Sequence, residues 1–183
     1  MTRRYIRAMQ PDQAVFILNA ALPALRHEHR ITRSVISAIP LDQGDYRPDP
    51  VTKSAMELAW HIVAAELRFL SGIAGGEFDF SARPRPESIT NSAGLGAYYE
   101  SAWETEFAKV AALTPEQLVK ILDFHGMLQL PAIAYLQFAQ NHSIHHRGQL
   151  SMYLRPMGAK VPSIYGESHD VAEARKAAQA GGN

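Results

Sequence analysis

Apolar residues recur at spacings of three and four along most of the chain, which is the pattern of helices that bury one face. The first such stretch covers Pro11–Ile39 and contains Pro23. Because proline lacks the N–H that its turn needs, we expect a kink or a local break there. The second stretch begins near Val51, where Thr52 or Ser54 is a suitable N-cap, and it ends at a group of glycines.

The second half of the chain is less regular until its last helix. Prolines and mixed polarity predict a loop over residues 76–91, long enough to be a lid or rim rather than a tight turn. A third helix is predicted over Leu95–Ala111, followed by a short helical turn in which Thr114–Gln117 forms a capping box. The alternation within Lys120–Leu130 favours two short extended pieces, and a last helix is predicted over Pro131–Met157.

Four substantial helices in a chain of 183 residues, of which 46% are hydrophobic, predict a single domain over residues 1–183. Each amphipathic face needs a partner to bury it. The expected fold is therefore all-α, a four-helix bundle with long loops and short extended pieces before the last helix. The tail, residues 171–183, is rich in alanine and ends in Gly-Gly-Asn, so we expect it to be partly flexible and frayed at its end.

Charge and cysteine content exclude several classes of protein. The 18 basic residues equal the 18 acidic ones, so no net positive field favours binding to nucleic acid. Because the chain has no cysteine, thiolate zinc sites, iron–sulfur clusters and cysteine nucleophiles are excluded, and a metal would need histidine or carboxylate ligands. The sequence shows no secretory signal and no apolar run of the ~18 residues that a membrane span needs. We therefore expect a soluble cytoplasmic protein without a membrane partner.

The most informative chemistry lies in the predicted last helix, which holds three of the eight histidines. With His142 as reference and about 100° per residue, His146 lies at about +40°, inside the apolar stripe, whereas His145 lies at about −60°, on its margin. The inward pair is therefore His142 and His146, whose spacing of one turn lets both imidazoles reach one divalent ion. His61, at the edge of the buried face of the second helix, is a candidate third ligand. Gln149, at about −20°, is a candidate hydrogen-bond partner of these histidines.

A simpler interpretation of these residues stays open. A histidine beside an apolar face is more often a hydrogen-bonded core residue than a metal ligand, and paired spacing alone is weak evidence. His27 and His29 lie in a charged run that is most simply a solvated helix face. His125 is expected on a short strand at a site rim, and His169 in a terminal loop. Arg147 follows a candidate ligand and is expected to be a surface or ion-pairing residue.

Two segments together carry a resemblance to a known family. The segment NHSIHHRGQLSMYLRPMGAKVPSIYGES, which begins at Asn141, resembles the last-helix signature of the DinB/YfiT-like superfamily of metal-binding four-helix proteins. The segment MELAWHIVAAELRFL resembles the part of that superfamily that donates the first histidine, and the resemblance extends over Met9–Ser168. It implies a bundle that is often dimeric, with nickel, zinc or another divalent ion held by His61, His142 and His146 and with open positions filled by water.

The resemblance also implies a reaction class. Characterised members of the superfamily include metal-dependent S-transferases and isomerases that use bacillithiol, mycothiol or glutathione. We therefore expect a metal-dependent enzyme of stress response or detoxification that acts on a small molecule. Its thiol would be a low-molecular-weight cosubstrate, because the chain has no cysteine. Two alternatives stay open: a non-catalytic stress-response binding protein with a structural or absent metal, and a metal-dependent hydrolase, which lacks an evident carboxylate base beside the histidines.

Overall fold

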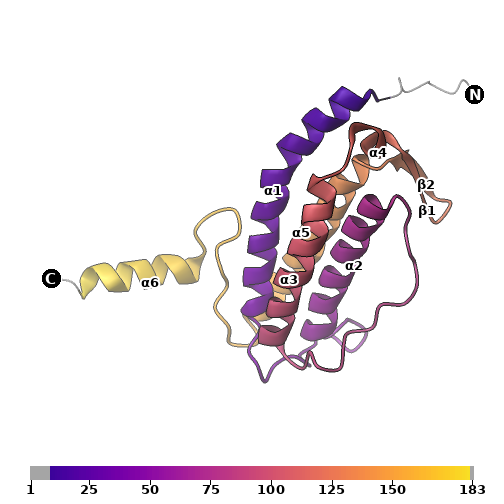
Figure 1. Ribbon diagram of the computed structural model, residues 1–183. Coiled ribbons are helices and arrows are strands. Elements are labelled where there is room, and N and C mark those ends of the chain that lie inside the picture. The colour runs from indigo at the N-terminus through magenta and orange to yellow at the C-terminus, as the bar shows by residue number, and fades with distance from the viewer. Residues whose placement is uncertain (1–8, 182–183) are drawn as a thin grey trace, which may run out of the picture.

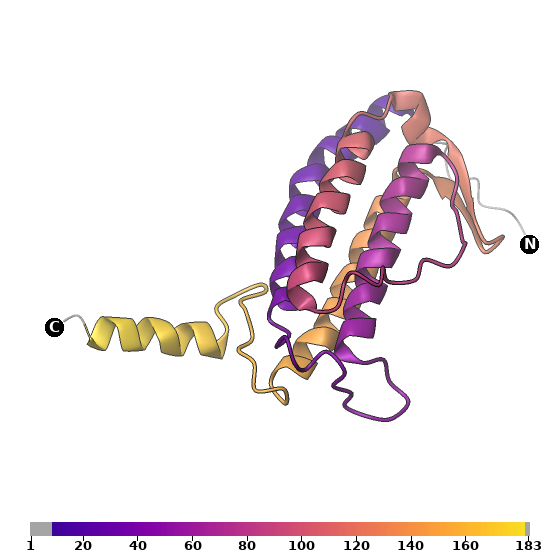
Figure 2. The same cartoon turned by 60° about the horizontal axis from the view of Figure 1, so that its bottom comes forward.

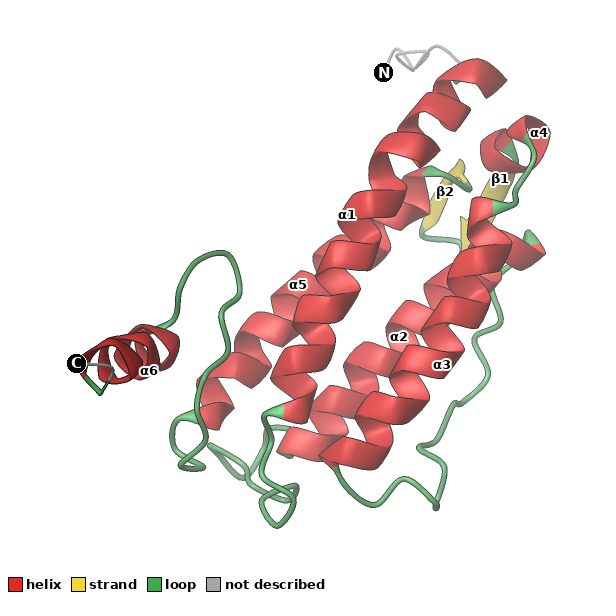
Figure 3. Ribbon diagram, turned by 60° about the vertical axis from the view of Figure 1, so that its left-hand side comes forward, coloured by secondary structure: helices red, strands yellow, loops and turns green. Residues whose placement is uncertain are grey.

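Four long helices pack side by side in the computed structural model, which describes residues 9–181 (Figure 1). They are α1 (Pro11–Ser37), α2 (Ala55–Gly75), α3 (Ser92–Ala111) and α5 (Ala134–Leu154). Helices α1 and α2 each contact both α3 and α5, so α1 and α2 lie diagonally opposite each other (Figure 3). The predicted all-α four-helix fold is confirmed. Within residues 9–181, no helix is long and apolar enough to cross a membrane.

The connection between α2 and α3, residues 76–91, runs back along the length of the bundle (Figure 2). Its length lets α3 start at the same end as α2, so these two helices are parallel. Gly76 ends α2 with φ 77°, a left-handed conformation that glycine adopts without a Cβ clash. Trp60 on α2 donates its indole N–H to the carbonyl of Arg83 at 2.9 Å. This bond holds the returning loop against α2, as expected of a rim rather than a tight turn.

A short helix and a hairpin close one end of the bundle. Helix α4 (Pro115–Val119) carries the predicted capping box, because the Thr114 hydroxyl accepts the N–H of Gln117 and the Gln117 side chain accepts the N–H of Thr114. The chain then forms β1 (Ile121–Phe124) and β2 (Leu128–Pro131), which pair antiparallel. The two predicted extended pieces before the last helix are therefore confirmed.

Several predicted helix boundaries need correction. Helix α2 begins at residue 55 rather than near Val51, because Ser54 and Glu57 form a reciprocal capping box with N–H to oxygen distances of 2.8 and 3.3 Å. Helix α5 begins after Pro131 because this proline is the last residue of β2. Helix α3 starts at residue 92 instead of the predicted 95. Helix α1 ends at residue 37 instead of 39, and α5 ends at residue 154 instead of 157.

Of the two outcomes expected at Pro23, a kink or a local break, the break is absent, because α1 is continuous through this residue. The proline removes the N–H that would bind the carbonyl of Asn19, but both residues are exposed, so water can satisfy this carbonyl. The buried face continues across it, with Leu18 before the proline and Leu25 after it. A proline on the solvent side of a helix therefore leaves the packing of the opposite side intact.

Most of the tail, predicted over residues 171–183 to be partly flexible, lies in a regular helix, and its flexibility stays a prediction. Helix α6 (His169–Ala180) starts with Ser168 as N-cap, so His169 is its first residue and not part of a loop. None of its residues is buried, and it stands away from the bundle (Figure 1). Asp170 in its first turn forms an ion pair with Arg155 at 2.9 Å, which ties this end of α6 to the bundle. Residues 182 and 183 lie outside the described part of the chain.

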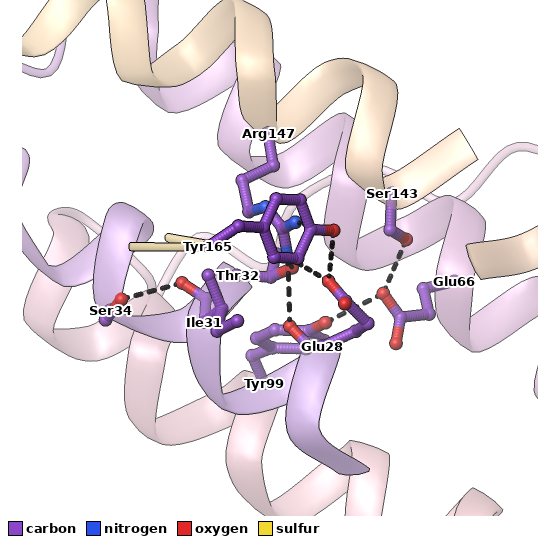
Figure 4. A network of polar contacts seen from close by, with 9 residues as sticks. All are labelled: Glu28, Ile31, Thr32, Ser34, Glu66, Tyr99, Ser143, Arg147 and Tyr165. Carbon is purple, nitrogen blue, oxygen red and sulfur yellow. Dashed lines mark hydrogen bonds and ion pairs between the residues drawn. The ribbon is translucent and has the colours of Figure 1, made fainter. Parts of the chain in front are cut away.

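A buried carboxylate joins three helices inside the bundle (Figure 4). Glu66 on α2 accepts hydrogen bonds from the Tyr99 hydroxyl at 2.8 Å and the Trp103 indole N–H at 2.7 Å, both on α3. It also accepts the hydroxyl of Ser143 on α5 at 2.6 Å. All four side chains are buried, and burial raises the pKa of Tyr99 so that its hydroxyl stays a donor. A buried carboxyl group is costly without such donors, so the three bonds fix α2 relative to α3 and α5.

The guanidinium of Arg147 on α5 is a second buried polar group (Figure 4). It forms an ion pair with Glu28 on α1 at 2.6 Å and lies 3.3 Å from the hydroxyl of Thr32. It also donates to the hydroxyl of Tyr165 at 2.6 Å, which holds the segment after α5 against the bundle. The predicted ion pair is present, but the side chain is buried rather than on the surface. Arg147 thereby fixes the rotation of α5 against α1.

Candidate metal centre

Two helices bring three histidines together: His61 on α2, and His142 and His146 one turn apart on α5. One ring nitrogen of each lies within 4.8 Å of the other two, and the Nε2 atoms of His61 and His146 are 3.2 Å apart. His145 is exposed and lies outside this group, as the helix register predicts. The side chains of the three residues predicted from the sequence therefore lie next to one another, and we name them the histidine triad.

The rotation of α5 is set by the residues that follow its two triad histidines. Ser143 and Arg147 are both buried, whereas the histidines before them are half-buried. Ser143 binds Glu66 on α2, and Arg147 binds Glu28 on α1. Because α5 is held on two sides in this way, its histidines are directed toward the histidine on α2.

All three triad histidines are half-buried, and the pKa values of His142 and His61 are lowered, which favours their neutral forms. Burial is the main cause that lowers the pKa of His142 to about 4, and the neighbouring His146 and His61 lower it further. Burial also lowers the pKa of His61, followed by the charges of His146, Lys53 and Arg68. A neutral imidazole keeps a free lone pair, which binding to a metal requires.

Gln149 fixes the proton on one triad histidine. Its side-chain oxygen lies 2.7 Å from Nδ1 of His146, so this nitrogen carries the proton and donates. The Nε2 atom of His146, which faces His61, is then left with its lone pair. The amide nitrogen of Gln149 lies 3.2 Å from Nε2 of His145, which holds the amide in this orientation. The predicted role of Gln149 as a hydrogen-bond partner therefore matches its position.

The triad fits a divalent cation that binds nitrogen ligands. Two histidine nitrogens at about 2.0–2.1 Å from a tetrahedral ion lie about 3.3 Å apart, close to the 3.2 Å between the Nε2 atoms of His61 and His146. The Nδ1 atom of His142 is buried and has no hydrogen-bond partner within residues 9–181. Three nitrogen ligands without a fourth protein ligand are typical of metal sites that keep a position open for water or substrate.

Two cavities meet at the triad. The apolar cavity, of about 480 Å³, is lined by His61, His146 and Gln149 together with mainly apolar side chains. The loop cavity, of about 440 Å³, lies between α2 and the returning loop and shares His61 and Lys53 with the apolar cavity. The other residues that line the apolar cavity are Pro48, Thr52, Leu58, Met152 and Tyr153. Small molecules can therefore approach the triad from two sides.

Comparison with known proteins agrees with this architecture. The sequence profile of the DinB family matches residues 18–177, which is most of the chain. This chain belongs to the DinB family. It is 32% identical over 133 residues to the uncharacterized protein YjoA of Bacillus subtilis, which is 71% of this chain and 84% of that protein. It is 28% identical over 113 residues to the uncharacterized protein YrdA of the same organism, covering 62% of this chain and 66% of that protein.

Solved structures have the same fold as this DinB protein. The crystal structure of the DinB-like protein YjoA from Bacillus subtilis matches with a TM-score of 0.67 and 26% identity, covering 81% of this chain and 98% of that one. A DinB-like protein from Bacillus cereus matches with a TM-score of 0.67 and 23% identity, covering 80% and 97%. The family membership that the sequence motifs implied is therefore confirmed.

His29 is buried, whereas the sequence analysis expected it on a solvated helix face. It is 2% exposed, its ring stacks on Trp103 with centroids 4.1 Å apart, and its Nε2 lies 3.1 Å from the carboxylate of Glu100. Burial lowers the pKa of His29 against the opposing effect of Glu100. The sequence did hold a signal, because one turn beyond the buried Leu25 reaches His29 on the same face of α1. His27, in contrast, is exposed as predicted.

His125 lies in the turn of the hairpin rather than on a strand. Its backbone has φ 58°, in the left-handed region, and its ring stacks on Phe80 with centroids 3.4 Å apart. It therefore joins the returning loop to the hairpin and takes no part in the triad.

The low pKa of His142 predicts a stability that depends on pH. A histidine in the unfolded chain takes up its proton near pH 6.5, whereas folded His142 does so only near pH 4. Between these values the unfolded state binds more protons, so we expect the metal-free protein to lose stability as the pH falls from 6.5 toward 4. Urea denaturation in EDTA at several pH values measures the change. The His142→Asn variant should show a smaller change, and an equal change would contradict this origin.

Proposed function

We propose that this DinB protein binds one divalent metal ion, nickel or zinc, through His61, His142 and His146. The observation that carries the proposal is the convergence of three imidazoles from two helices, with ring nitrogens at the spacing of metal ligands. Gln149 supports it by leaving Nε2 of His146 without a proton. Sites made of histidine accept nickel, zinc, copper and iron, and availability contributes to the choice among them.

We further propose that the protein is a metal-dependent S-transferase of stress response or detoxification. In this reaction the sulfur of a low-molecular-weight thiol bonds to an electrophilic carbon. The bond between that carbon and its leaving group breaks, the leaving group departs with the electron pair, and the thiol proton passes to water. The bound cation would supply a positive charge that favours the thiolate over the thiol. The thiol belongs to a small molecule because the chain has no cysteine.

The residues around the triad suit a reaction of two substrates. The apolar cavity offers Leu58, Met152 and Tyr153 beside His61, which suits the apolar body of an electrophile. The loop cavity opens on the other side of His61, so a thiol and an electrophile can reach the triad separately. Hydrolysis is less well supported, because the group formed by the triad contains no carboxylate within residues 9–181.

Product analysis tests the proposed reaction. The protein loaded with nickel or zinc is incubated with bacillithiol, mycothiol or glutathione and with a chlorinated aromatic electrophile. We expect chloride release and thiol loss at equal rates, above the uncatalysed rate, and no acceleration with His142→Ala. If the loaded protein accelerates the reaction with none of the three thiols, S-transfer is wrong. Metal removal that lowers thermal stability without any catalytic loss would instead favour a structural metal in a binding protein.

The support that Gln149 gives to His146 predicts a measurable effect on metal affinity. Loss of an outer hydrogen-bond partner of a metal ligand typically costs about 10–100-fold in affinity, so we expect Gln149→Ala to weaken zinc binding by this factor. Competition with a chromogenic chelator measures the dissociation constant. Gln137→Ala is the matched control, because Gln137 is an exposed glutamine on the same helix that binds Asn141 instead of a triad residue. Equal affinities of the two variants would rule out this role of Gln149.

We also propose that the protein acts as a homodimer, as the superfamily resemblance implies. Light scattering coupled to size-exclusion chromatography tests this point. A mass of twice the 20.2 kDa of one chain is expected, and a mass of 20.2 kDa at micromolar concentration would contradict it.

A further inference from the structure

The loop cavity beside the triad carries positive charge that the proposed metal site does not use. Lys53, Arg68 and Arg83 all line it, together with Trp60 and the triad residue His61. Arg68 lies on the same helix as His61, and Arg83 is on the returning loop that Trp60 holds by its indole N–H. Three cationic side chains therefore line one cavity. Arg68 lies on α2, Arg83 on the returning loop and Lys53 just before the N-cap of α2.

The carboxylates near this cavity are already engaged elsewhere. Glu57 also lines it, but its carboxylate accepts hydrogen bonds from Arg47 at 3.0 Å and from the N–H of Ser54 at 2.8 Å. Asp79 lies 3.9 Å from Arg83, at the outer limit of an ion pair, and accepts two bonds from Ser81. The cavity therefore keeps a net positive charge.

Arg68 has donor capacity that the protein leaves unused. Its Nη2 donates to the carbonyl of Ser81 at 2.7 Å, a neutral acceptor. Its Nε is buried and has no hydrogen-bond partner within residues 9–181. In the same part of the chain, no carboxylate forms an ion pair with Arg68 or Lys53. An unpaired buried donor of a guanidinium is costly, and a carboxylate or phosphate is the ligand that a guanidinium binds most strongly.

We propose that the loop cavity binds an anionic group, a carboxylate or a phosphate, of the small molecule that reacts at the triad. Arg68 and Arg83 bind the anion from two sides, and Lys53 lies at the passage between the two cavities. Arg68 follows His61 by seven residues, which places it about 10 Å further along the helix axis. The substrate is therefore an anion whose charged group lies nearer the C-terminal end of α2 than its reacting atom does. This assignment of a substrate class rests on the function proposed for the triad.

A titration with two anions tests the site separately from the reaction. The chain has two tryptophans, so its two indole N–H signals in a ¹H–¹⁵N spectrum can be assigned with one Trp60→Phe variant. The full-length protein is titrated with succinate and with inorganic phosphate at constant ionic strength. We expect a saturable shift of the Trp60 signal, while the signal of the buried Trp103 stays unchanged. Tighter binding of succinate identifies a carboxylate substrate, and tighter binding of phosphate identifies a phosphorylated one.

Variants decide whether the shift comes from the loop cavity. Arg68→Met should raise the dissociation constant of the anion at least about tenfold, since a charge-assisted hydrogen bond is lost. Arg83→Met serves as a second variant if Arg68→Met does not fold. Arg30→Met, at an exposed position of α1, is the matched control and should bind the anion as the wild type does. The proposal is overturned if neither anion gives a saturable shift, or if Arg68→Met and Arg30→Met bind equally.

The metal content of the same samples separates this proposal from the function of the triad. Arg68→Met should keep its metal, and His142→Ala, which removes a triad residue that does not line the loop cavity, should keep its anion binding while it loses metal. If the wild type binds metal but no anion, the substrate class is wrong and the metal site stands. If it binds the anion but no metal even after reloading, the function proposed for the triad is wrong and the loop cavity remains an anion site.

Discussion

Replacing His61 by alanine is expected to weaken zinc or nickel binding by more than about 100-fold, because the loss of an outer partner alone costs about 10–100-fold. His61 supplies the one triad nitrogen that comes from α2, so the variant would offer only two nitrogens, both from α5. Two protein ligands rarely hold a divalent ion against water. Elemental analysis of protein without an affinity tag, after dialysis, measures the result as about one ion per wild-type chain and almost none in the variant.

His27→Ala is the matched control for this experiment, because it removes a histidine that is exposed on α1 and remote from the triad. It should retain the metal content of the wild type. A His61→Ala protein that still holds one nickel or zinc per chain would show that the metal is bound elsewhere.

The largest effect on stability is expected from Glu66→Ala. The substitution leaves the Tyr99 hydroxyl, the Trp103 indole N–H and the Ser143 hydroxyl without their acceptor inside the bundle. Leaving one buried donor without an acceptor typically costs about 1–3 kcal/mol, so for three donors we expect a loss of at least about 3 kcal/mol in the free energy of unfolding. For a chain of this size each kcal/mol corresponds to about 2–4 °C in Tm, so the melting temperature should fall by roughly 10 °C. Chemical denaturation and calorimetry measure both quantities.

Two further glutamate variants show whether the buried acceptor causes this loss. Glu66→Gln keeps one carbonyl oxygen for Trp103, and the hydroxyls of Tyr99 and Ser143 can rotate to accept from the new amide group. We therefore expect it to cost less than half of what Glu66→Ala costs. Glu104→Ala removes a half-exposed carboxylate that pairs with Arg26 and should cost at most about 1 kcal/mol. A similar loss for Glu66→Ala and Glu104→Ala would contradict the argument.

The periodicity of apolar residues was enough to predict the bundle and the two extended pieces. Each long helix buries one face, and that face is what a spacing of three and four encodes. The local break, one of the two outcomes expected at Pro23, is absent, because the sequence pattern shows that a proline is present but not that it faces solvent. The helix α6 was not predicted, although the cap at Ser168 and the alanine content of the tail both favour a helix there.

The candidate site was predictable in part, for a physical reason. His142 and His146 lie on one helix, so their common direction follows from a fixed angle per residue. Their meeting with His61 depends on how two distant helices pack, and here the family motif supplied what periodicity could not. Glu66 was not predicted, because its partners on α3 and α5 are far away in sequence. Arg68 was missed for the same reason, since its cavity is formed by a loop that returns along α2.

The placement of the triad on two distant segments bears on how the chain folds. His61 and His146 are 85 residues apart in sequence, so a cation held by both closes a long loop. If the cation binds both histidines before folding is complete, it reduces the conformational entropy of the chain that is still unfolded, and loops of this length gain more from closure than short ones. Contacts so distant in sequence also form late and slowly during folding. Metal present during refolding should therefore raise the refolding rate as well as the final stability, because it would join α2 to α5 before the rest of the bundle has formed.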